Sequence, residues 1–462
     1  MKSSKLLTKL AACLLVLVLI AACGSGGGST AGDTAPSGGD SGETPSAAAE
    51  PSAEAEAPYE LTVGWWGGVA RHEKTLEMID LYTERFPQAT VIPNYAAFDD
   101  YWVQMSTLAA ANNMPDAMLV QLTYLGEYAQ RGLIRNLQPL VDAGHIDVSS
   151  FTAGALSGST IQGNLVGITM GDTSSATVYN KSLLERLGVT EMPSDQMLMS
   201  EFADYLKALV PLMPDGHYVA ELFARGEQNM EIFMRQHGFY GLTTEDGTEV
   251  GFSREALADF FNYHLDLYNA GVYGPIEIIL DDRNAQFGDS LRGRGLQAFW
   301  GTNVNQAKIF QSTLEDELGM LRSQVADGYT NRNVEVAVCS TWTIASNSNL
   351  ETEAARFISY MVNEWDLQSI YDMDIGVPGS TVIQQHLLDR LDVSDPVDAM
   401  KAREIELMQD ILGSIEPFNG RPAGYPVVVD DLRRLMDEIL AGNISVDAAV
   451  DSHFNSMSML LD

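Results

Sequence analysis

The sequence predicts an α/β protein that folds into two globular lobes or more. Its 462 residues are too many for one ordinary hydrophobic core. From Tyr59 onward, short apolar runs that are typical of strands alternate with amphipathic stretches that are typical of helices. Alternation at this spacing favours βαβ units and a mostly parallel sheet. In such a sheet, ligands bind beyond the carboxyl ends of the strands, so the loops that follow the strands are candidate binding loops.

The elements of the first lobe follow from apolar spacing and from the residues that end helices. One predicted helix places Leu76, Ile79 and Tyr82 on a single face, and Pro87 ends it. In chain order we predict a strand at Leu61–Val63, a helix at Arg71–Phe86, a strand at Thr90–Ile92, a helix with Tyr101, Met105 and Leu108 on one face, a strand at Ala117–Val120 and a helix at Leu122–Gln130.

A second α/β region runs from about Thr177 to Trp300, and further helices follow it. Apolar residues from Ala354 to Trp365 keep helical spacing, so Trp365 is predicted to continue a buried helix face. The remaining predicted elements are helices at Met199–Leu209 and Arg254–Tyr268, a strand at Ala298–Trp300, a candidate strand pair in "VEVAVCSTWTIAS", and a tail helix through Leu432, Leu435, Met436 and Ile439 that closes near Gly442.

Residues 1–22 are predicted to be a lipoprotein signal peptide. After a basic start, residues 10–22 form an unbroken apolar run of 13 residues, which is too short to span a bilayer comfortably. The run ends in "LIAAC", which resembles the lipobox of bacterial lipoproteins. That resemblance implies cleavage before Cys23 and a diacylglyceryl lipid on its thiol. The alternative is an ordinary signal followed by a chance cysteine.

Residues 23–57 are predicted to be a disordered tether. After Cys23 this stretch holds only Gly, Ser, Ala, Pro, Thr and acidic residues, a composition that cannot offset the entropy of ordering. A lipid on Cys23 would hold the globular body near a membrane surface without embedding it. Cys13 leaves with the signal, so Cys339 has no partner and is expected to be a small buried apolar residue.

Composition and motifs exclude several functions. Acidic residues outnumber basic ones by 63 to 27, giving a net charge of −36, which disfavours nucleic acid and other anionic ligands. The sequence has no G-x-x-x-x-G-K-[ST], G-x-S-x-G or H-E-x-x-H motif, and its seven histidines lack zinc-ligand spacing. No metal, no cofactor and no enzymatic activity is therefore predicted. A pair of carboxylates at the separation that glycosidases use stays open as an alternative.

Several segments, in their order and spacing, resemble one known family. They are "ELTVGWWGG", "EMIDLYTERFPQATVIPNY", "YWVQMSTLAAANNMPDAMLVQLTYLGEYAQRGLIRNL", "NLVGITMGDTSSATVYNKSLLERLGV", "RGRGLQAFWGTN", "VAVCSTWTIASNSNLETEAARFISYMVNE" and "LAGNISVDAAVD". Together they resemble the extracellular solute-binding proteins of ABC importers, the sugar-type family 1 that includes maltose-binding proteins, over about residues 59–456. One departure is Thr169 in "VGITMGD", where the family commonly has a proline.

The resemblance implies a periplasmic-binding-protein-like fold of type II, in which two α/β lobes are joined by a multi-segment hinge and one ligand lies between them. Crossings between the lobes are expected near Met170–Ser174, Thr341–Ala345 and Tyr371–Gly376. The expected division is 58–172 and 343–374 for lobe one, and 173–342 and 375–462 for lobe two.

Residues suited to binding a sugar stand at the expected strand ends and crossings. Aromatic rings cover the C–H faces of a sugar, and planar polar groups pair with its hydroxyls. The two glycines after Trp66 would let a ligand approach the backbone closely. The candidate ligand-binding residues are Trp65, Trp66, Trp102, Gln121, Tyr124, Asp172, Trp300, Asn303, Trp342 and Asn419.

Each candidate tryptophan has an alternative role in the hydrophobic core. For the adjacent Trp65 and Trp66, alternation along a strand predicts that one packs inward while the other faces the cleft. The leading hypothesis is a monomeric, membrane-anchored lipoprotein that captures a mono- or oligosaccharide and delivers it to an ABC importer. The alternatives are the same fold binding a peptide, polyamine or polyol, and a surface polysaccharide hydrolase.

Overall fold

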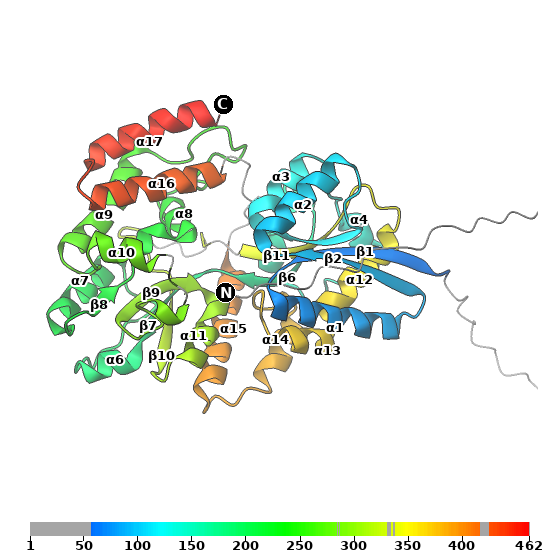
Figure 1. Cartoon of the computed structure of the whole chain (residues 1–462), viewed down its shortest axis with the longest axis horizontal. Helices are drawn as coiled ribbons and strands as arrows, with labels where there is room; N and C mark the ends of the chain where they lie inside the picture. The colour runs from blue at the N-terminus through cyan, green and yellow to red at the C-terminus, as the bar shows by residue number, and fades with distance from the viewer. Residues whose placement is uncertain are drawn as a thin grey trace, which may run out of the picture. The chain divides into compact units, whose positions relative to one another are not determined.

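The computed structural model describes residues 57–283, 285, 287–329, 334–335, 338–415 and 425–461. The predicted signal peptide, Cys23, nearly all of the predicted tether and Asn419 lie outside the described residues. The described residues contain two main sheets, and Figure 1 shows helices packed around both. This arrangement agrees with the predicted α/β class and with two lobes, each built on its own sheet.

The first sheet has the strand order β2-β1-β3-β11-β6. Strand β1 runs parallel to β2 and β3, whereas β11 runs antiparallel to both β3 and β6. Parallel pairing is therefore confined to the part of the sheet that the βαβ spacing predicted, because β11 and β6 arrive from distant parts of the chain. The bounds are Tyr59–Trp66 for β1, Ala89–Ala96 for β2, Ala117–Gln121 for β3, Ile168–Thr173 for β6 and Val338–Ile344 for β11.

The second sheet has the order β10-β7-β9-β8 and is mainly antiparallel, so the expectation of a mostly parallel sheet was wrong here. Only β8 and β9 pair in parallel. A small hairpin, β4-β5, stands apart from both sheets. The bounds are Ser175–Asn180 for β7, Tyr218–Ala220 for β8, Gln297–Asn303 for β9, Leu318–Arg322 for β10, Thr160–Ile161 for β4 and Asn164–Leu165 for β5.

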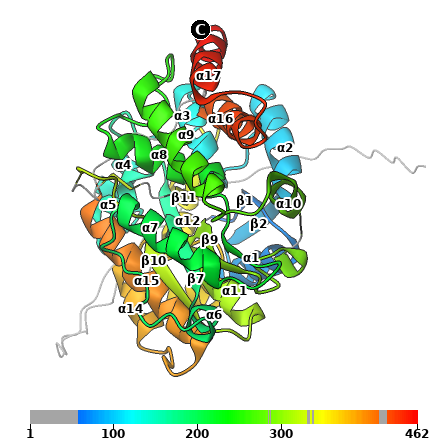
Figure 2. The ribbon, with the colours of Figure 1, turned by 90° about the vertical axis from the view of Figure 1, so that its left-hand side faces the viewer.

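Helices α3 and α7 have the predicted bounds, and α1 and α9 differ from prediction by one or two residues at their ends. Helix α15 lies beside β10 in both Figure 1 and Figure 2. In the described part of the chain, no helix has both the length and the apolar character needed to cross a membrane. The helices are α1 Val69–Arg85, α2 Phe98–Ala110, α3 Leu122–Gln130, α4 Gln138–Asp142, α5 Ala153–Ser157, α6 Lys181–Arg186, α7 Met199–Leu209, α8 Glu227–Gln236, α9 Arg254–Asn269, α10 Ile276–Asp282, α11 Ala307–Thr313, α12 Glu351–Asn363, α13 Trp365–Tyr371, α14 Thr381–Leu388, α15 Pro396–Ser414, α16 Tyr425–Leu440 and α17 Val446–Leu460, with short 3₁₀ turns at Val210–Leu212, Phe223–Arg225, Phe287–Asp289 and Val304–Gln306.

The predicted helix face that ends at Trp365 is divided between two helices. Glu364 has extended backbone (φ −83°, ψ 127°), so α12 ends there and α13 begins at Trp365. The indole of Trp365 is partly buried against the second lobe, with the Arg390 guanidinium 4.0 Å above its ring. Periodicity alone did not reveal this break because the apolar spacing continues across it.

The adjacent Trp65 and Trp66 are both buried, with 0% and 5% of their surfaces exposed. Alternation places them on opposite faces of β1, as predicted, but helices cover both faces. Trp65 donates its Nε1 proton to Nδ1 of His72 on α1 at 3.1 Å. Trp66 packs on the other side against Tyr101 and Trp102 of α2, with ring centroids 5.7 and 5.3 Å away. Neither ring is therefore openly exposed, contrary to the expectation that one of them would face a ligand.

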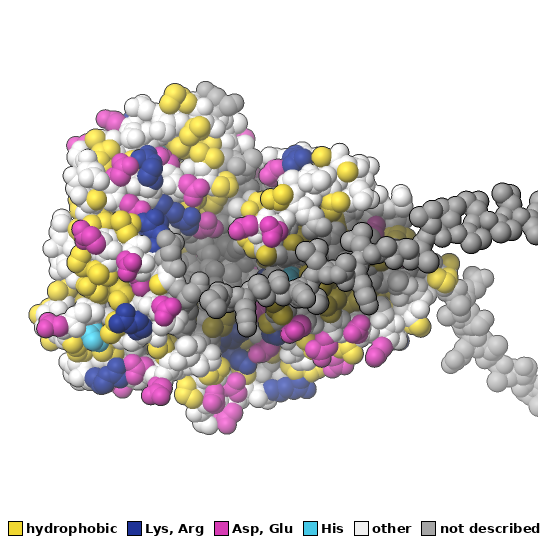
Figure 3. Space-filling model, in the orientation of Figure 1, with side chains coloured by type: hydrophobic (Ala, Val, Ile, Leu, Met, Phe, Trp, Pro, Cys, Tyr) yellow, Lys and Arg dark blue, Asp and Glu magenta, His cyan; other side chains and the backbone are white. Residues whose placement is uncertain are grey.

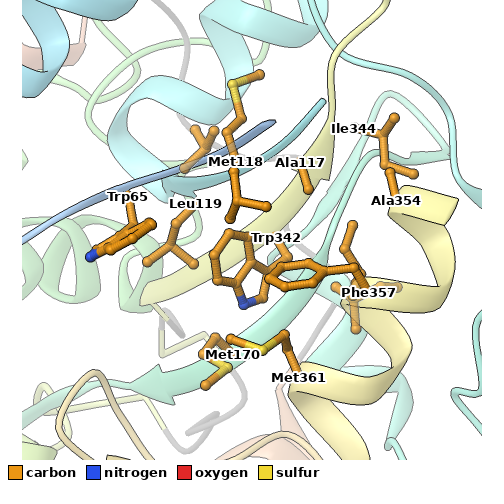
Figure 4. Close-up of a cluster of buried hydrophobic side chains, with 14 of the residues drawn as sticks. Trp65, Ala117, Met118, Leu119, Met170, Trp342, Ile344, Ala354, Phe357 and Met361 are labelled. Atoms are coloured by element: carbon orange, nitrogen blue, oxygen red, sulfur yellow. The ribbon is translucent and has the colours of Figure 1, made fainter. Parts of the chain in front are cut away.

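Two other candidate tryptophans belong to the core. Trp342 is 2% exposed and meets the Phe357 ring edge-to-face at 5.6 Å, as Figure 4 shows. Trp300 is fully buried and meets Phe310 at 5.9 Å with an interplanar angle of 84°. These positions correct the expectation that Trp300 and Trp342 present ring faces to a ligand. Both stand in the middle of interior strands of their sheets, where large side chains pack into the core.

The chain passes between the sheets at several points. Strand β6 belongs to the first sheet and β7 to the second, with only Ser174 between them. The crossing expected at Thr341–Ala345 was misplaced, because β11 already pairs in the first sheet from Val338. The boundary expected after residue 342 therefore lies inside a strand of lobe one. The other expected lobe boundaries stay predictions.

Two of the crossing segments touch through their backbones. Asp172 and Val377 exchange two backbone hydrogen bonds of 2.8 Å each. A Cβ atom on Gly171 would lie 2.9 Å from the backbone of Gly376, and one on Gly376 would lie 2.7 Å from the backbone of Asp172. Real Cβ contacts are longer than this, so both positions require glycine. The crossing segments therefore join as a tight ribbon without side chains between them.

Replacing Trp342 with alanine should destabilise the first lobe strongly. Removing a large buried aromatic side chain costs about 3–5 kcal/mol, through lost transfer free energy and the cavity left behind. Denaturant unfolding measures the change. Trp365→Ala is the matched control, and its loss should be clearly smaller because Trp365 is only partly buried. Equal losses in the two variants would contradict the assignment of Trp342 to the core.

Folding stability should also respond to pH through His264, which is 3% exposed on α9. Burial lowers the pKa of His264 from 6.5 to about 3. The unfolded chain therefore binds one more proton than the folded chain between these values, and stability falls as pH falls from 6.5 towards 3. The slope from this group is at most about 1.4 kcal/mol per pH unit.

Urea unfolding of the wild type and of His264→Gln at pH 7.5, 6.0 and 5.0 tests this effect. The variant should be less stable at pH 7.5, because it loses the contact between Nδ1 and the Tyr273 hydroxyl at 3.0 Å. Its deficit should shrink at lower pH. The exposed His145→Gln serves as the control and should keep a constant difference from the wild type. A constant deficit for His264→Gln would rule out a neutral buried imidazole.

Candidate functional site

A pocket of about 540 Å³ opens where β1 gives way to α1, and we call its lining the first wall. Gly67 lies at its base: its N–H donates to the Ala96 carbonyl at 3.1 Å, the last hydrogen bond of the pairing between β1 and β2 before α1 begins. A Cβ on Gly67 would lie 2.7 Å from Cδ of Arg71, so the glycine leaves room for that side chain. The first wall consists of Trp66, Gly67, Gly68, Val69, Ala70, Arg71, Phe98 and Asp374.

Phe98 is the aromatic ring that this wall exposes. Its surface is 38% exposed, whereas Trp66 and Trp102 beneath it are 5% and 7% exposed. The Phe98 ring meets both indoles nearly edge-on, at 6.0 and 5.9 Å. Trp102 in turn stacks on Tyr124 at 3.8 Å. The two tryptophans thus pack beneath the exposed phenyl ring and hold it in place.

A second pocket, of about 360 Å³, lies at the carboxyl ends of β8 and β9 and at the start of α8. We call its lining the second wall. Strand β9 ends at Asn303, and the turn after β8 leads into α8 at Glu227, so both segments reach the same edge of the sheet. The second wall consists of Ser175, Glu221, Leu222, Phe223, Arg225, Gly226, Glu227, Gln228, Asn229, Gly301, Thr302, Asn303, Gln306 and Arg433.

Two separate groups of hydrogen bonds hold the amides of the second wall. Gln228 Nε2 donates to Asn303 Oδ1 at 2.7 Å. The Ser175 hydroxyl donates to Asn229 Oδ1, and Asn229 Nδ2 donates to the Phe223 carbonyl at 3.2 Å. Gln228 Oε1 is buried and has no hydrogen-bond partner among the described residues. These amides are therefore held in place, and Gln228 Oε1 can still accept a hydrogen bond from a further donor.

The charged groups of the second wall are neutralised by neighbours. Arg225 forms a short ion pair with Asp437. Arg433 donates Nε to the Arg225 carbonyl at 2.9 Å, and its guanidinium lies 3.9 Å from the Glu227 carboxylate. Over the surface in Figure 3, acidic side chains are likewise interspersed with basic ones. The second wall therefore presents dipoles rather than a net charge, despite the overall charge of −36.

A hydrogen bond links the first wall to the segment that follows Asn303. Asn305, two residues after Asn303 of the second wall, donates Nδ2 to the carbonyl of Asp374 at 3.4 Å. Asp374 belongs to the first wall and also to the crossing segment after α13. The crossing segment therefore contacts residues of both lobes.

Asp172 lies within the crossing and is fully buried. Burial raises the pKa of Asp172 well above its ordinary value. Its carboxyl oxygens have no hydrogen-bond partner among the described residues. Asp172 lines neither wall, so a direct contact with a ligand, as expected from sequence, receives no support from its position.

Two of the sequence candidates, Trp66 and Asn303, line the walls. Trp102 and Tyr124 lie behind Phe98, and half-buried Gln121 immediately precedes α3. Trp65, Trp300 and Trp342 are core residues, and Asn419 lies outside the described residues. The ligand-binding roles of Trp66, Trp102, Gln121, Tyr124, Asn303 and Asn419 stay predictions.

Sequence reasoning missed several wall residues. Arg71 stands just after the "WWGG" stretch, and Phe98 stands four residues before the candidate Trp102, so that proximity was a usable signal. Gln228 and Asn229 carried no signal, because nothing in their local sequence separates them from an ordinary helix start. Asp374 became a wall residue only through the path of the crossing segment.

Comparisons with solved structures give the same architecture. An extracellular solute-binding protein family 1 structure from Alicyclobacillus acidocaldarius is 20% identical, with a TM-score of 0.72 over 88% of this chain and 100% of that chain. The sugar-binding protein MalE from Xanthomonas citri is 17% identical, with a TM-score of 0.70 over 87% and 97%. An oligogalacturonide-binding protein from Yersinia enterocolitica, in complex with saturated digalacturonic acid, is 18% identical, with a TM-score of 0.67 over 87% and 98%. At these identities the likeness shows the fold.

A sequence comparison with protein families identifies the family as well as the fold. The family described as bacterial extracellular solute-binding protein matches residues 77–386, which is more than half of the chain. This stretch includes most of the first sheet, the whole second sheet and the crossing segment that carries Asp374. The chain belongs to the family of bacterial extracellular solute-binding proteins.

Proposed function

We propose that this protein captures a carbohydrate between its two lobes and delivers it to an ABC importer in the cell membrane. The observation that carries the proposal is the second wall, where hydrogen bonds hold the uncharged amides of Gln228, Asn229 and Asn303 in place. Planar amides can donate to one sugar hydroxyl and accept from another, and a neutral wall suits an uncharged ligand. A wall for a peptide terminus or a polyamine would instead need unpaired charge.

The first wall supports the same ligand class. The exposed Phe98 ring offers a surface for the C–H face of a sugar, and Gly67 and Gly68 allow the ring to approach the backbone. Two of the related structures are named for sugar or oligogalacturonide binding, which adds support from the family. We propose a neutral sugar in preference to an acidic one because this chain neutralises the arginines of its second wall.

Capture would proceed by population shift. A sugar that touches both walls gains its full set of contacts only when the lobes come together, so it favours that state by the difference in affinity. The importer would then recognise the loaded form, and a monomer suffices for this cycle. Closure of two lobes about a hinge is a recognised transition of such architectures.

A thermal-shift screen of the purified mature protein tests the ligand class. The panel contains α- and β-linked di- and trisaccharides of glucose, galactose and mannose, digalacturonic acid, short peptides and polyamines. A ligand that binds only the folded state raises the unfolding midpoint by mass action. We expect a rise with neutral oligosaccharides and none with the other classes. A rise with peptides or polyamines alone would overturn the carbohydrate proposal.

Truncating the second wall should weaken binding of the best neutral sugar from this screen. Gln228→Ala removes an amide that bonds both Asn303 and the ligand, which should cost about 1–2 kcal/mol, or roughly 5- to 30-fold in affinity by calorimetry. Gln385→Ala on the exposed face of α14 is the control and should bind as the wild type does. Chromatography of the same mixtures checks the alternative of hydrolysis, which new shorter sugars would indicate.

Membrane attachment is proposed through a lipid on Cys23. In Cys23→Ser the acceptor thiol is absent, so the chain should remain unprocessed or be released without lipid. Mass spectrometry of the N-terminal peptide and membrane fractionation measure the outcome, with Cys13→Ser, in the apolar run, as the control that should still be lipidated. An unmodified Cys23 thiol in protein extracted from membranes would exclude this anchor.

A further inference from the structure

We propose that Arg71 and Asp374 together bind the sugar on the first wall, and that this contact links ligand binding directly to the crossing segment Tyr371–Val377. The inference rests on the proposed function. It adds two residues that were not among the sequence candidates, and it assigns them a role in sensing the ligand in addition to holding it.

The geometry places this pair on the pocket surface. Arg71 Nε lies 2.9 Å from Asp374 Oδ2, and the two side chains are 23% and 30% exposed. Both residues line the first wall together with Trp66 and Phe98. Within the part of the chain that the structure describes, the Nη nitrogens of Arg71 and the Oδ1 oxygen of Asp374 make no hydrogen bond. The ion pair therefore orients both groups and leaves donors and an acceptor available.

These free atoms match the chemistry of neighbouring hydroxyls. A guanidinium donates to the oxygen of one hydroxyl, and a carboxylate accepts the proton of the next. Because the two charges cancel, the pair does not attract anions or cations strongly, which agrees with a neutral ligand. The nearby Phe98 ring would cover a C–H face of the same sugar.

Asp374 belongs to a segment that both lobes hold. Arg71 comes from α1 of the first lobe, and Asn305 from the second lobe donates to the Asp374 carbonyl at 3.4 Å. Lys308 of α11 donates to the Asp372 carbonyl at 2.7 Å, and Lys401 of α15 lies 3.0 Å from the Asp372 carboxylate. A displacement of Asp374 would therefore disturb contacts with residues of both lobes.

The backbone of this segment is in an unusual conformation. Asp372 and Met373 have φ values of 49° and 59°, in the left-handed region that side chains rarely adopt. Such residues persist only where surrounding contacts hold them. The contacts from Lys308 and Lys401 serve this purpose. A sugar that binds Asp374 would therefore change the contacts of a segment whose backbone is already held in an unfavourable conformation.

Calorimetry and hydrogen exchange on the mature protein test the inference. The probes are the neutral di- and trisaccharides of the screen, and the variants are Asp374→Asn, Arg71→Gln and Asp195→Asn. Asp195 pairs with Arg403 at 2.6 Å with 29% and 34% exposure, away from both walls, and so controls for the loss of an ordinary ion pair. Thermal unfolding of each variant confirms that it is folded, and Arg71→Lys provides a milder replacement.

For the probe that binds the wild type most tightly, Asp374→Asn and Arg71→Gln should each lose about tenfold or more in affinity, while Asp195→Asn retains it. Saturation with this probe should slow exchange of the backbone amides of 371–377 in the wild type, and much less in Asp374→Asn. Wild-type affinity and protection in the wall variants would overturn the inference and leave the proposed function standing. Failure of the wild type to bind any probe would overturn both.

Discussion

The backbone contact between the two crossing segments is the constraint on which the two-lobed arrangement depends. Asp172 and Val377 exchange hydrogen bonds, and Gly171 and Gly376 leave no space for a side chain between the segments. Peptide groups supply this junction, and its close approach depends on the absence of side chains at Gly171 and Gly376. The two crossing segments are thereby held at a fixed distance from each other, and relative motion of the lobes must be absorbed by the backbone torsions of the crossing residues.

The exposed aromatic surface of the first wall lies directly over buried residues of the core. Trp66 and Trp102 are buried under Phe98, and the same two indoles also fill the space between β1 and α2. Core packing and the exposed pocket surface are therefore supplied by different members of one aromatic cluster. This division explains why a tryptophan count is a poor guide to the pocket: the two indoles are buried by packing, and the smaller Phe98 ring at the start of α2 is the one that is exposed.

Charge is handled differently on the surface as a whole and at the walls. The chain carries a large acidic excess, which favours solubility. At the walls, Arg225 and Arg71 each have a carboxylate partner, so the local surface is nearly neutral. A buried or half-buried charge without a partner would be costly. Pairing removes this cost and leaves directional donors and acceptors, which distinguish hydroxyl patterns better than a net charge does.

Much of the local structure was determined by the sequence alone. Apolar spacing predicted α3 and α7 with their observed bounds, and the "WWGG" stretch, predicted to follow a strand, lies at the end of β1 beside a pocket. These features depend on residues close together in the chain, whose spacing reflects the helix or strand period directly. The order of family-like segments also predicted the family, to which the chain belongs.

Tertiary structure alone decided which side chains reach the pockets. Trp300 and Trp342 were expected at strand ends or crossings, yet both stand in the middle of interior strands, where Phe310 of α11 and Phe357 of α12 pack against them. Asp374 is more than 300 residues from Arg71 in the chain, and only the path of the crossing brings them together. Burial and proximity of this kind arise from contacts between distant segments, and the period of a local sequence pattern carries no information about them.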